Sequence, residues 1–138
     1  MSNGLADLSG PQRLRIDVAG QATAATVAEF AGIVVPFNAK VTAVTYTPFS
    51  AVTGAATNNF TVTCRNRGQA GAGTVTPASL NFANTVNAAA FVPTTVTLSA
   101  TASDLVLLKN DVLTFEKLVV GTGMAMPAGA ITVEIQGN

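Results

Sequence analysis

Short runs in which polar and apolar residues alternate are the feature that most constrains this chain. Residues 13–18 read Arg-Leu-Arg-Ile-Asp-Val, and the same alternation returns at 60–65 and at 131–135. A two-residue period puts every second side chain on the same face of an extended segment, as in a strand with one buried face. A helix has a period of 3.6 residues and does not produce this pattern. These three runs therefore predict β-strands.

The rest of the chain follows the same plan of short strands and turns. Val and Thr, which favour pleated surfaces, are frequent throughout. Further strands are expected at 27–35, 41–47, 80–82, 92–98 and 113–118, and turns at 66–74, 110–111 and 121–129. A helix over 23–31 is the alternative there, but β-branched residues at 27 and 33–35 favour a strand. About eight strands with turns between them predict an all-β fold, an antiparallel, jelly-roll-like sandwich.

The chain is expected to divide near residue 26. Residues 1–26 would form an extended N-terminal arm and linker, and residues 27–138 the β-sandwich domain. The linker at 20–26 consists mainly of small residues. It would let the preceding strand reach beyond its own domain.

The strand at 13–18 would be the part of the arm that binds a partner. A lone strand is marginally stable and must add to another sheet. We expect it to pair along an exposed edge of a neighbouring subunit or of a larger assembly, with its arginines facing an acidic patch. The alternative is an ordinary first strand of the same domain. The candidate interface residues of this segment are Leu5, Leu8, Arg13, Leu14, Arg15 and Ile16.

Charged residues are scarce. Asp, Glu, Lys and Arg make up 10% of the chain, seven positive and seven negative, against about 25% in an ordinary domain. Little repulsion then keeps copies apart, so the composition predicts a surface covered by partners and a homo-oligomer. Neutrality argues against nucleic-acid binding, which needs a basic face. The sequence has no apolar run of 18 residues, so no membrane-spanning helix is expected.

The residues that catalysis and metal binding need are absent or isolated. The chain has no His, the commonest general base and metal ligand. Cys64 has no His to activate it, and its alternating run favours a buried, inert thiol. Asp104 and Asp111 are candidates for a carboxylate pair, but Asp beside a turn is usually a turn former. The glycine-rich segment 68–74 lacks the ending of a phosphate-binding loop. We therefore expect no enzyme, no metal and no cofactor.

Arg65 and Arg67 are the remaining candidate interface residues. They are two positions apart, so on one continuous strand both side chains point to the same face. Two hypotheses remain open. The arginines anchor an acidic neighbour, or they form a solvated pair at the end of a strand.

A series of turn motifs resembles a known family. The motifs are Thr-Gly-Ala-Ala-Thr-Asn-Asn at 53–59, Asn-Arg-Gly-Gln-Ala-Gly-Ala-Gly-Thr at 66–74, Val-Asn-Ala-Ala-Ala-Phe at 86–91, Asn-Asp-Val-Leu at 110–113 and Val-Gly-Thr-Gly-Met-Ala-Met-Pro at 120–127. In this order the chain resembles, over roughly residues 27–136, small structural proteins of tailed bacteriophages that decorate the head. The resemblance implies a jelly-roll-like domain, often trimeric, on the outside of a capsid, with no catalytic residues. Relatives often carry acidic residues where this chain has the uncharged loop 69–72.

Together these features predict a structural virion protein. It would bind the outside of a phage capsid as a decoration or cement protein, and stabilise the shell by binding only its assembled state. The expected partners are the major capsid protein and further copies of the chain in a homotrimer. Neither nucleic acid nor membrane is expected as a partner. The protein would be made in the host cytoplasm and located on the virion. The alternative is a fibre, tail or adhesin module that binds a host surface ligand.

Overall fold

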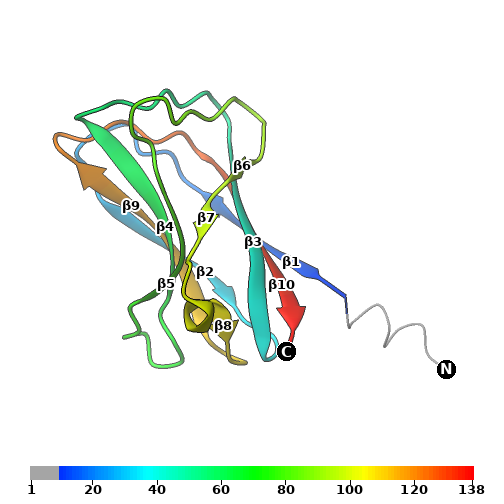
Figure 1. Ribbon diagram of the computed structural model, residues 1–138. Coiled ribbons are helices and arrows are strands. Elements are labelled where there is room, and N and C mark those ends of the chain that lie inside the picture. Colours follow the sequence, from blue (N-terminus) through cyan, green and yellow to red (C-terminus); the bar gives the residue numbers. More distant parts are fainter. Residues whose placement is uncertain (1–9) are drawn as a thin grey trace.

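Two β-sheets packed face to face make up the fold. The computed structural model describes residues 10–138 (Figure 1). The first sheet has the order β1 (Gln12–Val18), β10 (Gly129–Gly137), β3 (Ala39–Pro48) and β6 (Thr94–Thr95), with β8 (Val106–Leu107) also paired to β3. The second has the order β2 (Ala28–Val34), β9 (Val112–Val120), β4 (Asn59–Asn66), β5 (Val75–Asn81) and β7 (Thr97–Leu98). One short 3₁₀ helix, Ala102–Leu105, precedes β8.

The strand pairs nest inside one another. β1 pairs with β10, β2 with β9, β3 with β6 and β4 with β5, all antiparallel. A long hairpin rolled into two facing sheets gives this arrangement, which is the jelly roll. The predicted all-β, antiparallel, jelly-roll-like sandwich is therefore confirmed. Residues 10–138 contain ten strands, against the eight or so expected, because the predicted strand at 92–98 is divided into two and β8 was not predicted.

Two predicted strands differ from the structure in their bounds. The run at 92–98 divides into β6 and β7, which lie in different sheets, and the chain crosses between them at the buried Val96. β5 (Val75–Asn81) begins five residues before the predicted strand at 80–82. The first part of β5 was missed because Pro77 is typical of a turn. The β4–β5 register shifts between Cys64 and Asn66, alongside Pro77. An irregular ladder accommodates a residue that has no N–H to donate.

The expected division into an arm and a domain is corrected for residues 12–18. This segment is β1, and it pairs over its whole length with β10 of the same chain, from Gln12 opposite Ile135 to Val18 opposite Gly129. Its apolar side completes the core of its own sandwich, where Val18 is buried. The apolar face that requires a sheet thus finds one within the domain. Leu5 and Leu8 lie outside the described residues.

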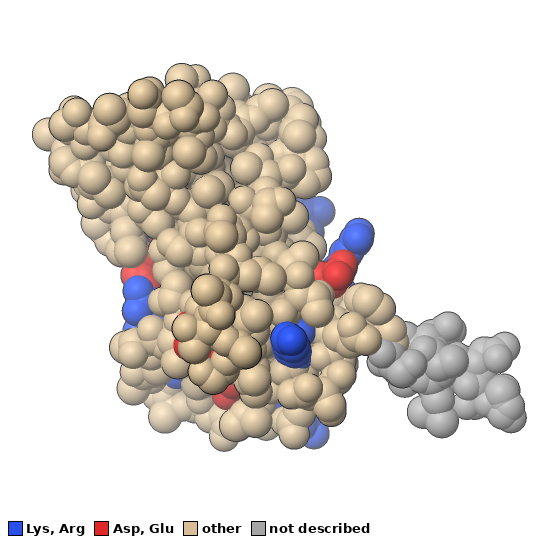
Figure 2. All heavy atoms as spheres, in the orientation of Figure 1, with Lys and Arg blue, Asp and Glu red and all other residues tan. Residues whose placement is uncertain are grey.

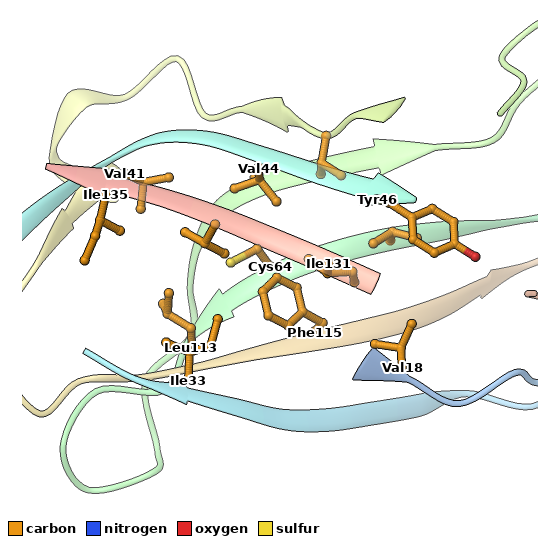
Figure 3. Close-up of a cluster of buried hydrophobic side chains, with 14 of the residues drawn as sticks. Val18, Ile33, Val41, Val44, Tyr46, Cys64, Leu113, Phe115, Ile131 and Ile135 are labelled. Atoms are coloured by element: carbon orange, nitrogen blue, oxygen red, sulfur yellow. The ribbon is translucent and has the colours of Figure 1, made fainter. Parts of the chain in front are cut away.

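The core lies between the two sheets and contains the apolar side of each alternating run. Figure 3 shows Val44, Tyr46 and Ile131 of the first sheet facing Cys64 and Phe115 of the second. All five side chains are shielded from solvent. The core is built from β-branched and aromatic side chains that alternate with outward polar ones, as a sandwich requires.

Candidate interface at the charge-free end

The predicted arm residues lie on an edge strand and interact within the chain. Leu14 and Ile16 are partly buried against the core. Arg13 Nε donates to Glu134 Oε2 over 3.3 Å, and Arg15 Nη2 donates to Asp17 Oδ1 over 2.9 Å. β1 has no second neighbour in its sheet among residues 10–138. Charged side chains on such an edge discourage pairing with another chain.

Arg65 and Arg67 meet, as predicted, on one face, and they join a cluster of opposite charges there. Arg65 pairs with Glu116, and Arg67 forms a two-pronged pair with Glu29, with Nη2 2.6 Å from Oε1 and Nε 2.8 Å from Oε2. Thr114 Oγ1 also donates to Glu29. The two carboxylates come from β2 and β9, and β9 lies between β2 and β4 in the sheet, although the three strands are far apart in the sequence. Both arginines therefore have acidic partners inside the chain.

This cluster predicts a loss of stability in acid. The hydrogen bond from Arg67 holds the pKa of Glu29 below its usual value of 4.5. A lowered folded-state pKa gives stability that is present above the unfolded pKa and lost as the pH falls through the folded pKa. Between pH 5 and 3 we expect the wild type to lose about 0.5–1 kcal/mol more than Glu29→Gln, because partly exposed ion pairs have that magnitude. Urea unfolding at each pH measures this, and parallel curves for the two proteins would contradict it.

The other candidates for chemistry are buried in the core or hydrogen-bonded within the fold. Cys64 is fully buried, and burial raises the pKa of its thiol to about 12, which keeps it neutral at pH 7. Asp104 accepts a hydrogen bond from Ser99 Oγ, and Asp111 accepts from Asn66 and from the backbone N–H of Leu108. Within residues 10–138 no three His, Cys, Asp or Glu side chains are grouped so as to hold a metal ion. No helix in that range is long and apolar enough to cross a membrane.

Lys117 is a residue that the sequence analysis missed. It is fully buried, its Nζ donates to the carbonyls of Thr23 (3.3 Å) and Ala24 (3.0 Å), and it lies 5.9 Å from the centre of the Phe60 ring. Burial lowers the pKa of its ammonium group. Lys117 fastens the β1–β2 loop to the sandwich. Its inward direction follows from the alternation at 113–118, which puts positions 113, 115 and 117 on the buried face.

Four loops gather at one end of the sandwich, the upper end in Figure 1, and contain no charged residue. We call this surface the cap; it comprises the loops at 19–27, 49–58, 82–93 and 121–128. Figure 2 shows no atom of Lys, Arg, Asp or Glu over this end on the side in view. The charged residues lie instead along the middle and the opposite end of the molecule. The charged residues of the chain are therefore distributed unevenly, and one end of the molecule has none.

Backbone hydrogen bonds join the cap loops to one another. Gln21 and Met126 exchange two of them, and so do Val52 and Ala88. In addition, the N–H of Gly54 donates to Asn87 Oδ1 over 2.9 Å. Each bridge connects loops that are far apart in the sequence. The cap is thus a preformed surface rather than four independent loops.

Glycines allow these loops to approach closely. A Cβ on Gly54 would lie 1.9 Å from the carbonyl oxygen of Ala83, and one on Gly123 would lie 2.1 Å from that of Ala24. Gly123 also has a φ of +79°, which side chains rarely adopt. Of the turn motifs that the sequence analysis singled out, those at 53–59 and 120–127 thus serve to pack the cap.

The cap exposes a cluster of large apolar side chains. Phe49 and Phe91 are 63% and 71% exposed, and their ring centres lie 6.1 Å apart. Val27, Val92 and Val120, also in or beside these loops, are exposed as well. A shallow hollow of about 450 Å³ lies beside Phe49, lined by Gly20, Ala22, Ser50, Ala51, Ala125, Met126 and Pro127. Exposed apolar side chains gathered at one end of a soluble protein in this way mark an interaction site.

Comparison with known proteins gives no match: no family model, no curated protein and no solved structure resembles the chain significantly.

Proposed function

We propose that this chain is a structural virion protein that binds the outside of a phage capsid and stabilises the shell, and that it docks through the cap. The observation that carries this proposal is the cap itself, a preformed, charge-free surface with two exposed aromatic rings. The jelly-roll fold is compatible with the proposal, although a fold by itself does not define a function.

The composition of the cap matches the centre of a protein–protein interface. Such centres are depleted in Lys, Glu and Asp and enriched in aromatic residues and Met. The cap has the exposed rings of Phe49 and Phe91, the partly buried Met124 and no charge. Because no ion must be desolvated, burying this surface carries little electrostatic cost. Since its loops are already joined, little conformational entropy is lost on docking.

The proposal includes a non-catalytic role and self-association as a trimer. The chain acts by adding contacts to the assembled shell, and the absence of His from its sequence fits that role. Trimeric association rests on the resemblance to head-decoration proteins and on the low charge of the chain. The opposite end of the molecule and the sheet faces remain for contacts between copies.

Shells assembled from the capsid protein of the same phage, without this chain, provide the test. We expect the wild type to bind, and Phe49→Ser combined with Phe91→Ser to weaken binding at least 100-fold, since buried aromatic anchors each contribute about 2 kcal/mol or more. Leu108→Ser is the matched control, because Leu108 is an exposed apolar residue outside the cap. Co-sedimentation with the shells measures the affinity.

Two results would contradict the proposal. One is a folded wild type that does not bind the shells. The other is a double variant that binds as tightly as Leu108→Ser. Binding of the wild type to host cells, without binding to shells, would instead support the adhesin alternative.

A further inference from the structure

Backbone strain is concentrated in one loop of the cap. Among residues 10–138, the non-glycine residues with positive φ are Thr85 (71°), Phe91 (60°) and Asn110 (74°). Asn adopts this left-handed conformation readily, whereas for a β-branched or bulky residue it is a true outlier. Thr85 and Phe91 both lie in the loop 82–93. The loop that displays the most exposed aromatic ring is therefore also the strained one.

The fold gains little from Phe91 in return for this strain. Its ring is 71% exposed, and its ring partner, Phe49, is exposed as well. The backbone at the same position is firmly held, because the N–H of Phe91 donates to the carbonyl of Pro48 over 2.8 Å. The structure thus fixes the backbone that carries this ring without burying the ring. Unrelieved strain of this kind is typical of functional positions.

We propose that Phe91 is the anchor of the docking surface, held in a left-handed backbone so that its ring, with that of Phe49, enters an uncharged apolar depression on the capsid shell. This inference rests on the proposed function and adds the role of the strained backbone at Phe91 and the kind of site that the ring meets. A backbone fixed in advance loses little conformational entropy on binding, so more of the free energy gained by burying the ring remains as affinity.

The surroundings of the ring favour a protein partner. No cation lies in the cap loops to meet phosphate groups, so the chemistry does not suit nucleic acid or an anionic lipid surface. Exposed uncharged polar side chains, among them Thr53, Thr57 and Asn84, lie in the same cap loops as the rings. Hydrocarbon cannot hydrogen-bond these groups, whereas the rim of a protein interface can.

The test compares two substitutions that relieve the same strain. Asn tolerates the left-handed region, so Thr85→Asn and Phe91→Asn each lower the energetic cost of the backbone conformation at that position. We expect Thr85→Asn to raise Tm by about 2–4 °C, which measures the strain in this loop. Leu108→Ser, outside the cap, is the variant expected to bind shells like the wild type. The Tm of Phe91→Asn should be no more than about 2 °C below that of the wild type. Its affinity for shells should fall at least about 30-fold, the loss expected for one aromatic anchor.

Each contrary result has a distinct meaning. Shell binding by Phe91→Asn within threefold of the wild type overturns the anchor and leaves the proposed function standing. A Tm lowered by more than 5 °C in Phe91→Asn, or an equal loss of binding in Leu108→Ser, also overturns it, because the ring is then structural or the loss is not specific to the cap. A wild type that fails to bind shells overturns both proposals. Phe91-dependent binding to phosphatidylcholine vesicles, or Phe91-dependent self-association in sedimentation without shell binding, assigns the ring to lipid or to a second copy and overturns the shell anchor.

Discussion

Replacing Phe82 with Ala is expected to lower the free energy of unfolding by about 3–5 kcal/mol, the usual cost of removing a buried aromatic ring. Phe82 is fully buried beneath the cap, 4.9 Å from the Phe60 ring and 6.3 Å from the Tyr46 ring between centres. Its backbone also holds the cap, since its carbonyl accepts the N–H of Ala55 and its N–H donates to Phe60. The substitution therefore leaves a cavity at the point where the cap meets the core.

Urea unfolding followed by far-ultraviolet circular dichroism measures this loss, with Phe82→Leu as the control. Leu keeps most of the apolar volume, so its cost should stay near 1.5 kcal/mol. Because small domains are stable by only about 5–15 kcal/mol, the Ala variant should unfold at clearly lower urea concentrations. A loss below 1.5 kcal/mol in Phe82→Ala would mean that the aromatic cluster does not support the cap.

The second large effect is expected at Gly54. An Ala there would place its Cβ 1.9 Å from the carbonyl oxygen of Ala83 and 2.3 Å from that of Val86. Both obstacles are backbone atoms, so the two loops must separate and lose the hydrogen bond to Asn87. We expect a destabilisation of about 3 kcal/mol, the upper part of the range for overpacking, and weaker docking because the cap is no longer preformed.

Gly71→Ala is the matched control for that substitution. Gly71 has a φ of +79° with nothing within 4 Å of the added Cβ, so only the left-handed backbone penalty of about 1 kcal/mol applies. Thermal unfolding of both variants, together with the shell-binding assay, separates steric conflict in the cap from backbone strain elsewhere. Equal losses of stability in the two variants would show that the cap loops can move apart without cost.

The sequence alone determined most of the local structure. Alternation at 13–18, 60–65 and 131–135 predicted strands that the structure contains as parts of β1, β4 and β10. A two-residue period depends only on neighbours in the chain, so the buried side of each run could be predicted without knowing what covers it. The same reasoning put Arg65 and Arg67 on one face. It also contained the inward direction of Lys117, which went unnoticed because lysine is seldom buried.

Only the tertiary structure decided which segments meet. β1 has the same apolar face whether it binds a neighbour or its own domain. In the structure β1 pairs with the edge of β10 and so completes its own sheet. Glu29 and Arg67 are 38 residues apart, and their pairing depends on β2 and β4 flanking β9. The cap likewise exists only because the nested strand order brings four separate loops to one end. Strand pairing of this kind is fixed by the long-range register of the whole sheet, which no short stretch of sequence contains.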